Sequence, residues 1–177
     1  MGLEELFGRI EKRFGKEAVV GNDIKVDTVS SGSMALDEIL GGGFALGRIH
    51  EIYGGFSSGK SSAALHLSAS VQKTLGKAVG YVDTEQALDL EYAKALGVDL
   101  SRDKSQPDSA EQALEIVREM LEVPEIGLVV LDSVAGLVPE AVLQGEAGDA
   151  KIALVARLMS QQLSILKNVC KKNGNIL

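Results

Sequence analysis

The sequence predicts an α/β fold in which helices flank a mostly parallel sheet. From residue 48 onward, strand-like and helix-like segments alternate, which is the order that parallel strands joined by crossover helices require. Residues 127–131 form an unbroken apolar run that Asp132 ends, as is typical of a strand buried on both faces. With 177 residues the chain is long enough for one hydrophobic core.

The first part of the chain is predicted to be an arm set apart from this core. Residues 3–14 place Leu, Phe and Ile at helical spacing with charged residues between them, as in an amphipathic helix. A short alternating strand follows at 24–29, and a turn signal then precedes a helix at 34–40 that a run of glycines ends. We therefore divide the chain into an arm at 1–32 and a core at 33–177.

Within the core, a strand is predicted at 48–53, followed by a glycine-rich turn and a helix at 59–75 that a glycine closes. A later helix at 108–122 starts with a capping box formed by Asp108 and Glu111. The other predicted elements are strands at 78–83 and 127–132, helices at 89–96 and 149–172, and the opening of a further strand at 175–177.

Composition predicts a cytoplasmic protein and excludes several kinds of site. No apolar run approaches the roughly 18–20 residues of a membrane span, and the N-terminus lacks the pattern of a secretory signal. Cys170 is the single cysteine, which excludes an intrachain disulfide and a thiolate metal cluster. The net charge is −7, yet residues 151–177 carry five basic residues and no acidic one, so we expect a polyanion to meet this end.

Residues 54–61 match the phosphate-loop pattern G-x-x-x-x-G-K-[ST] and lie between a predicted strand and a predicted helix, as that pattern requires. The glycines allow backbone N–H groups to curl around phosphate oxygens at the start of the helix. We expect Lys60 to bridge the β- and γ-phosphates of ATP and the Ser61 hydroxyl to bind Mg²⁺. The nucleotide contacts predicted here are Gly54, Gly55, Phe56, Ser57, Ser58, Gly59, Lys60, Ser61 and Ser62.

Acidic residues follow two of the predicted strands at the edge where open α/β folds bind ligands. Asp132 ends the apolar strand and is the expected second ligand of Mg²⁺. Asp83 and Glu85 follow the neighbouring strand. Glu85 is the expected catalytic base, because it lies beyond the strand end and can reach a water in line with the γ-phosphate. Asp83 lies closer to the sheet and is interpreted as a capping residue.

Several separate blocks of this sequence resemble the bacterial RecA recombinase family. The Walker motifs alone fit many NTPases, whereas the blocks that follow Asp132 restrict the resemblance to recombinases. The blocks are SGSMALD at 31–37, EIYG at 51–54, SSGK at 57–60, VDTEQALD at 82–89, SQPD at 105–108, LDSVA at 131–135, GEAGD at 145–149 and ARLMSQ at 156–161.

The resemblance implies a DNA-dependent ATPase with a RecA-like P-loop NTPase fold. Such a protein forms a helical filament of its own copies on single-stranded DNA and pairs that DNA with a homologous duplex in recombination and repair. Lys60, Ser61 and Asp132 match the phosphate and Mg²⁺ ligands, and Glu85 matches the catalytic glutamate. Asp89 and Tyr92 match the adenine contacts. The residues that match DNA contacts are Gly145, Glu146 and Ile152 of the first DNA-binding loop, together with Arg157.

The resemblance covers the arm, which in the family packs on the neighbouring subunit, and the first half of the ATPase core. Family members are longer, so we expect a fragment whose sheet is incomplete on the C-terminal side. The pair Gly55 and Phe56 stands where the family usually has Pro-Glu, which puts loop rigidity in question. Residues 101–104 are more polar than the edge strand that the family has there, so we expect that strand to be frayed. Two alternatives stay open: an accessory ATPase with a RecA-like core, and a non-catalytic fragment that binds nucleotide or recombinase filaments without strand exchange.

Overall fold

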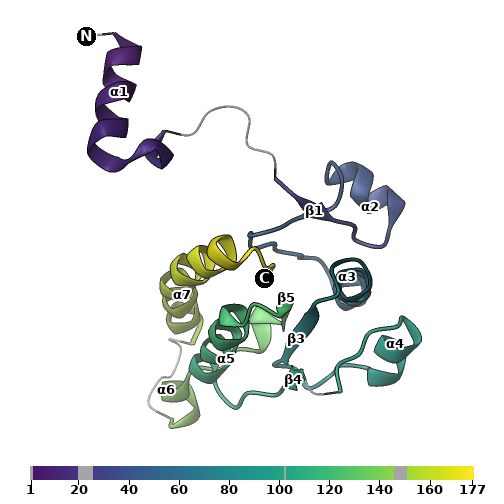
Figure 1. The fold of residues 1–177 in the computed structure, drawn as a ribbon. Coiled ribbons are helices and arrows are strands. Elements are labelled where there is room, and N and C mark those ends of the chain that lie inside the picture. Colours follow the sequence, from purple (N-terminus) through teal and green to yellow (C-terminus); the bar gives the residue numbers. More distant parts are fainter. Residues whose placement is uncertain (1, 20–25, 102, 146–150) are drawn as a thin grey trace.

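Parallel strands form the centre of the protein. In the computed structural model, which describes residues 2–19, 26–101, 103–145 and 151–177, the sheet has the order β4–β3–β5 (Figure 1). The strands are β3 (Ala78–Asp83), β4 (Lys104–Ser105) and β5 (Ile126–Asp132), and both neighbours run parallel to β3. The predicted α/β class with a parallel sheet is thereby confirmed. Of the edge strand expected at 101–104, the structure shows strand geometry at Lys104, and β4 continues to Ser105.

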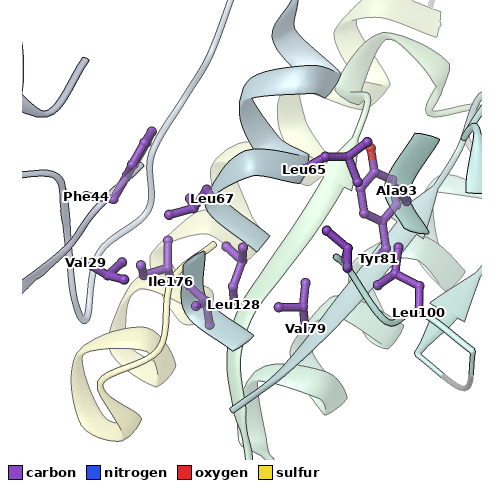
Figure 2. Packing of buried hydrophobic residues seen from close by; sticks show 12 residues of the cluster. Val29, Phe44, Leu65, Leu67, Val79, Tyr81, Ala93, Leu100, Leu128 and Ile176 are labelled. Atoms are coloured by element: carbon purple, nitrogen blue, oxygen red, sulfur yellow. The ribbon is translucent and has the colours of Figure 1, made fainter. Parts of the chain in front are cut away.

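Helices cover both faces of this sheet. The helices α3 (Lys60–Leu75) and α4 (Leu90–Ala95) contribute to the hydrophobic cluster on one face, and α5 (Ala110–Glu122) and α7 (Lys151–Asn173) to the cluster on the other. Side chains of β3 alternate between these clusters, as the pleat of a strand requires. Val79 and Tyr81 point to the first cluster (Figure 2), and Val82 points to the second.

A small hairpin packs beside the first cluster. Its strands β1 (Thr28–Val29) and β2 (Phe44–Ala45) pair antiparallel, and the helix α2 (Met34–Ile39) lies between them in sequence. Val29 and Phe44 are both buried in the first cluster, so they attach the hairpin to the core (Figure 2). The predicted helix at 34–40 is confirmed, and of the strand predicted at 24–29 the structure shows residues 28–29.

The helix α1 (Leu3–Phe14) lies apart from the sheet and its helices (Figure 1) and is followed by the short 3-10 helix η1 (Lys16–Ala18). Its bounds are those predicted from the apolar spacing. None of its residues is buried, and Leu3 and Phe14 are 73% and 65% exposed. An apolar face left this open is consistent with an arm that docks elsewhere.

The helix α5 begins one residue later than the predicted capping box implies. Ser109 is its N-cap, and the Ser109 side chain accepts a hydrogen bond from the backbone N–H of Gln112 at 3.2 Å. The Gln112 side chain in turn accepts the N–H of Asp108 at 2.7 Å. The prediction that Asp108 and Glu111 cap the helix was therefore wrong, because Ser109 and Gln112 satisfy the same spacing rule one position on.

The predicted strand at 48–53 is also wrong, because this segment has no regular strand geometry. Its backbone pairs with the last residues of the chain: Arg48 accepts from the N–H of Leu177 at 3.2 Å, and His50 donates to Leu177 at 2.7 Å. Ile176 in turn forms a parallel bridge with Leu128 of β5. Residues 175–177 thus lie between β5 and residues 48–50, where the opening of a strand is predicted, and Ile176 pairs with β5 through a single bridge.

A turn at the end of α7 places these last residues. The side-chain amides of Asn173 and Asn175 both donate to the carbonyl oxygen of Leu121, at 2.8 and 2.6 Å. Because Leu121 lies near the end of α5, this pair of bonds ties the end of α7 to the end of α5. The remaining elements are η2 (Val134–Gly136) and α6 (Glu140–Leu143). Over the described ranges, no helix combines the length and apolar character needed to span a membrane.

The close approach of Gly43 to Val29 gives a test of the hairpin. Gly43 has a φ of +114°, and a Cβ there would lie 2.2 Å from the carbonyl oxygen of Val29. We expect Gly43→Ala to lower the free energy of unfolding by about 3 kcal/mol in urea titrations. The control is Gly41→Ala, where φ is +72° but a Cβ would meet no described atom within 4 Å, so about 1 kcal/mol is expected. Equal losses of unfolding free energy in the two variants would contradict the close packing of Gly43 against Val29.

Burial of Cys170 gives a pH-dependent test of the second cluster. The side chain is 0% exposed, and burial raises the pKa of the thiol from 9.0 to about 11. The thiol therefore stabilises the folded state fully below pH 9 and loses this contribution as pH rises toward 11. Comparing urea unfolding of wild type and Cys170→Ala, we expect the stability difference to shrink by about 1 kcal/mol between pH 8 and pH 10. A pH-independent difference would mean that the thiol is solvated.

Candidate functional site

The candidate site is built on the ends of two neighbouring parallel strands. The register of the sheet pairs Asp83 with Asp132, and the N–H of Thr84 donates to the carbonyl oxygen of Asp132 at 2.9 Å. The peptide bond between Asp132 and Ser133 is cis. Parallel strands that end level present their following residues at one edge of the sheet. The structure therefore brings together the acidic residues that the sequence predicts for this edge.

The predicted phosphate loop curls into the first turn of α3. Ser57 and Gly59 have φ of 54° and 88°, and Gly59 is the N-cap of α3. The first N–H groups of a helix have no partner within it, so those of Lys60, Ser61 and Ser62 are available to an anion. The loop is not blocked by its own aromatic side chain, because Phe56 is fully exposed to solvent.

The Lys60 side chain folds back over this loop. Its ammonium donates to the carbonyl oxygens of Gly55 and Gly54, at 2.9 and 3.3 Å. The carbonyls satisfy the ammonium only in part, since it can donate three hydrogen bonds. A phosphate at the loop would offer charged acceptors in their place, and an ammonium binds a charged oxygen more strongly than a neutral carbonyl oxygen. The loop is thus closed by a contact that an anion can displace.

Asp132 joins the loop to the sheet. Its Oδ2 atom accepts a hydrogen bond from the Ser61 hydroxyl at 2.7 Å and another from the Tyr81 hydroxyl at 2.7 Å. Burial, reinforced by the hydrogen bond to Asp132, raises the pKa of Tyr81 well above its ordinary value, so the phenol remains a donor at neutral pH. Both donors therefore fix the orientation of the carboxylate.

Tyr81 was missed in the sequence analysis. Its ring is 0% exposed and packs in the first cluster beside Leu65 (Figure 2), while its hydroxyl reaches the site. The signal in the sequence was its position two residues before Asp83, which puts it on the face of β3 that α3 covers. The sequence does not show that β5 lies beside β3. The structure does, and it thereby identifies Asp132 as the carboxylate that the Tyr81 hydroxyl contacts.

The oxygen atoms at this point fit a hard divalent cation. Ser61 supplies a hydroxyl and Asp132 a carboxylate, which are the ligand types that Mg²⁺ prefers. Among the described residues there is no cluster of three or more His, Cys, Asp or Glu side chains that could hold a metal ion. A cation held here would therefore complete its coordination with phosphate oxygens and water, as Mg²⁺ commonly does.

Asp83 and Glu85 differ in their surroundings. Asp83 is 2% exposed, accepts the N–H groups of Ala87 and Leu88 at 3.2 Å each, and forms an ion pair with Lys104 at 3.3 Å. It closes the turn after β3, which agrees with the interpretation of Asp83 as a capping residue. Glu85 is exposed and accepts a hydrogen bond from the Ser133 hydroxyl.

A pocket of about 140 Å³ opens beside the loop, between the start of α3 and the turn that leads into α4. It brings together residues that are predicted to bind phosphate, to bind Mg²⁺, to act as the catalytic base and to contact adenine. Asp89 caps α4 by accepting the N–H of Tyr92 at 2.9 Å, and Tyr92 is 39% exposed. The predicted site residues that line it are Ser61, Ser62, Glu85, Asp89, Tyr92 and Asp132.

The residues predicted to bind DNA lie elsewhere. Gly145 follows α6 with a φ of 78°, and Ile152 and Arg157 are exposed on α7. None of these three lines the pocket. Glu146 lies outside the described residues. The structure thus separates the predicted DNA-binding residues from the predicted nucleotide site.

Comparisons with known proteins agree along the whole chain. The family model described as RecA N-terminal domain matches residues 2–177. A protein named Protein RecA from Arthrospira platensis is 49% identical over 177 residues, 97% of this chain and 48% of that protein. A second protein named Protein RecA, from Latilactobacillus sakei, is 49% identical over 180 residues, which are 98% of this chain and 50% of that protein. The chain therefore spans about half the length of these curated relatives.

The role of the Tyr81 hydroxyl in orienting Asp132 can be tested by removing that one oxygen atom. Tyr81→Phe keeps the buried ring and removes one of the two donors to Asp132, so the carboxylate is held less firmly. We expect the affinity for Mn²⁺, measured by electron paramagnetic resonance with a non-hydrolysable ATP analogue, to fall by about tenfold. The control is Tyr53→Phe, because Tyr53 is 88% exposed. It should change the affinity for Mn²⁺ by less than about twofold. Unchanged affinity in Tyr81→Phe would show that Ser61 alone orients Asp132.

Proposed function

The chain belongs to the RecA N-terminal domain family, and from this membership we propose that the protein is an ATP-dependent recombinase stimulated by single-stranded DNA. In this proposal it forms a filament on DNA and promotes homologous pairing and strand exchange in DNA repair. The observation that carries the proposal is the hydrogen bond from Ser61 to Asp132, at 2.7 Å. It joins the start of the phosphate-loop helix to the end of the neighbouring buried strand, as a magnesium-nucleotide site requires.

The proposed binding of ATP uses the start of α3. The free N–H groups of Lys60, Ser61 and Ser62 face the phosphates, and the helix dipole favours their negative charge. Lys60 exchanges the carbonyl oxygens of Gly54 and Gly55 for phosphate oxygens. Ser61 and Asp132 hold Mg²⁺, which when bound neutralises charge on the β- and γ-phosphates. Asp89 and Tyr92 flank the base at the far side of the pocket.

Hydrolysis in this proposal depends on Glu85. Its carboxylate is exposed at the end of β3 and lines the same pocket as Ser61 and Asp132. A carboxylate in that position can orient a water toward the γ-phosphate and accept its proton. Asp83 is unsuited to the task because its oxygens are already engaged with Lys104 and with the turn that follows β3.

DNA is proposed to bind along α7 and the segment before it. Arg157, Lys167 and Lys171 are exposed on α7, and residues 151–177 contain no acidic side chain that would repel phosphate. Self-association is proposed to use α1, whose apolar residues Leu3 and Phe14 are exposed. Burying such side chains against a second copy would remove apolar surface from water.

The Lys60 side chain provides the test of this function. In the protein as its gene encodes it, we expect ATP hydrolysis to rise when single-stranded DNA is added. Lys60→Ala should lower the DNA-stimulated rate by about a hundredfold, because it removes a cation that stabilises charge in the transition state. Lys73→Ala changes an exposed lysine in the last turn of the same helix and should keep the wild-type rate within about twofold.

Two outcomes would contradict the proposal. A wild-type rate that does not respond to single-stranded DNA would exclude a recombinase and favour an accessory ATPase. Failure of the wild-type protein to bind a fluorescent ATP analogue would leave only a role in protein interaction.

A further inference from the structure

Lys104, on the edge strand β4, contacts the carboxylate at the end of β3. The register of the sheet pairs Lys104 with Tyr81. Side chains two residues apart on a strand share a face, so Asp83 lies on this same face one step further along β3. The Nζ atom of Lys104 lies 3.3 Å from Oδ2 of Asp83, and the two side chains are 20% and 3% exposed. The ion pair is therefore largely removed from water.

Lys104 belongs to none of the sequence blocks that carry the resemblance to the RecA family. The nearest block, SQPD, starts at Ser105, and residues 101–104 are the stretch that is more polar than the family's edge strand. The contact between Lys104 and Asp83 is thus a property of this chain to which the motifs assign no role.

The carboxylate of Asp83 holds the turn that forms one wall of the pocket. Its Oδ1 atom accepts the N–H of Ala87 and its Oδ2 atom accepts the N–H of Leu88, at 3.2 Å each. Gln86, just before these two residues, has a φ of 55°, a left-handed conformation that is unfavourable for a residue with a side chain. The bonds to Asp83 offset that cost. The turn residues that line the pocket are Glu85, Ala87, Leu88 and Asp89.

The turn leads directly into the residues proposed to contact adenine. Asp89 ends the turn and caps α4, and Tyr92 lies in the first turn of that helix. Glu85 is held differently, because it accepts the hydroxyl of Ser133 from beyond the other strand. Loss of the bonds from Asp83 would therefore displace the adenine side of the pocket more than the carboxylate proposed as the base.

We propose that Lys104 is a positioning residue for the nucleotide base: its ion pair fixes Asp83, and Asp83 fixes the turn that carries Asp89. This inference rests on the proposed function. A carboxylate as buried as Asp83 needs partners that compensate its charge, and the ammonium of Lys104 supplies the charged one. Without the ammonium, the carboxylate gains hydration by turning toward water, and this movement breaks its bonds to the turn.

The test is Lys104→Met, which keeps the length of the side chain and removes its charge, in the protein as its gene encodes it. Affinity for a fluorescent ATP analogue should fall by about tenfold, the effect expected for loss of a bond between charged groups. In ATP hydrolysis with single-stranded DNA, KM should rise by a similar factor of about ten, while kcat stays within about twofold. Lys104→Arg keeps a cation and should stay within about threefold of the wild-type affinity.

Two further variants separate positioning of the turn from other effects. Lys77→Met makes the same change at a half-buried lysine before the other end of β3, away from the pocket, and should leave the affinity within about twofold of wild type. Asp83→Asn combined with Lys104→Met removes both charges of the pair, so the net charge near the pocket is that of wild type. The Asn side chain offers one acceptor atom where the carboxylate offers two, so the affinity should stay about tenfold below wild type.

Other results would overturn the inference. Wild-type affinity in the double variant would mean that Lys104 acts through its charge on the phosphates, and unchanged affinity in Lys104→Met would mean that the ion pair does not position the turn. A joint fall of affinity and kcat that Lys104→Arg does not relieve would show a general structural defect. Each of these results, with a wild-type protein that binds the analogue, contradicts this inference alone. A wild-type protein that does not bind the analogue removes the proposed function itself.

Discussion

The register between β3 and β5 is the constraint on which the candidate site depends. Because Asp83 pairs with Asp132, the two strands end level, and the residues after them meet at one edge. The hydroxyl of Tyr81 then reaches Asp132, and Ser133 reaches Glu85. A shift of one residue in this pairing would turn every side chain of one strand to the opposite face, so the apolar clusters on both faces also enforce the site geometry.

The position of the phosphate loop depends on a second constraint, at the end of α7. The segment before the loop pairs with residues 175–177, which the amides of Asn173 and Asn175 hold through Leu121. This arrangement has a cost, because Oδ1 of Asn175 is buried without a hydrogen-bond partner among the described residues. An unsatisfied buried acceptor costs about 1–3 kcal/mol, which the apolar burial of Ile176 offsets in part.

Lys60 and Glu85, the two groups proposed to act on the nucleotide, are each held by a neutral partner. Lys60 is bound by the carbonyls of Gly54 and Gly55, and Glu85 by the hydroxyl of Ser133. Neutral partners compete weakly with charged ones, so a phosphate bound at the loop would displace the first contact. The second contact is fixed by backbone bonds to Thr84.

Local patterns in the sequence were sufficient for the helices at 3–14 and 59–75, for β3 and β5, for the glycine-rich turn before α3, and for the placement of Asp132 and Glu85 at one edge. Apolar spacing, glycine caps and motif spacing depend on near neighbours in the chain, so they can be read without a structure. The strand expected at 48–53, the partners of Tyr81 and Ser133, and the turn through Asn175 could not be read in this way. Each of them depends on which distant segment lies alongside, and only the packed tertiary structure decides that.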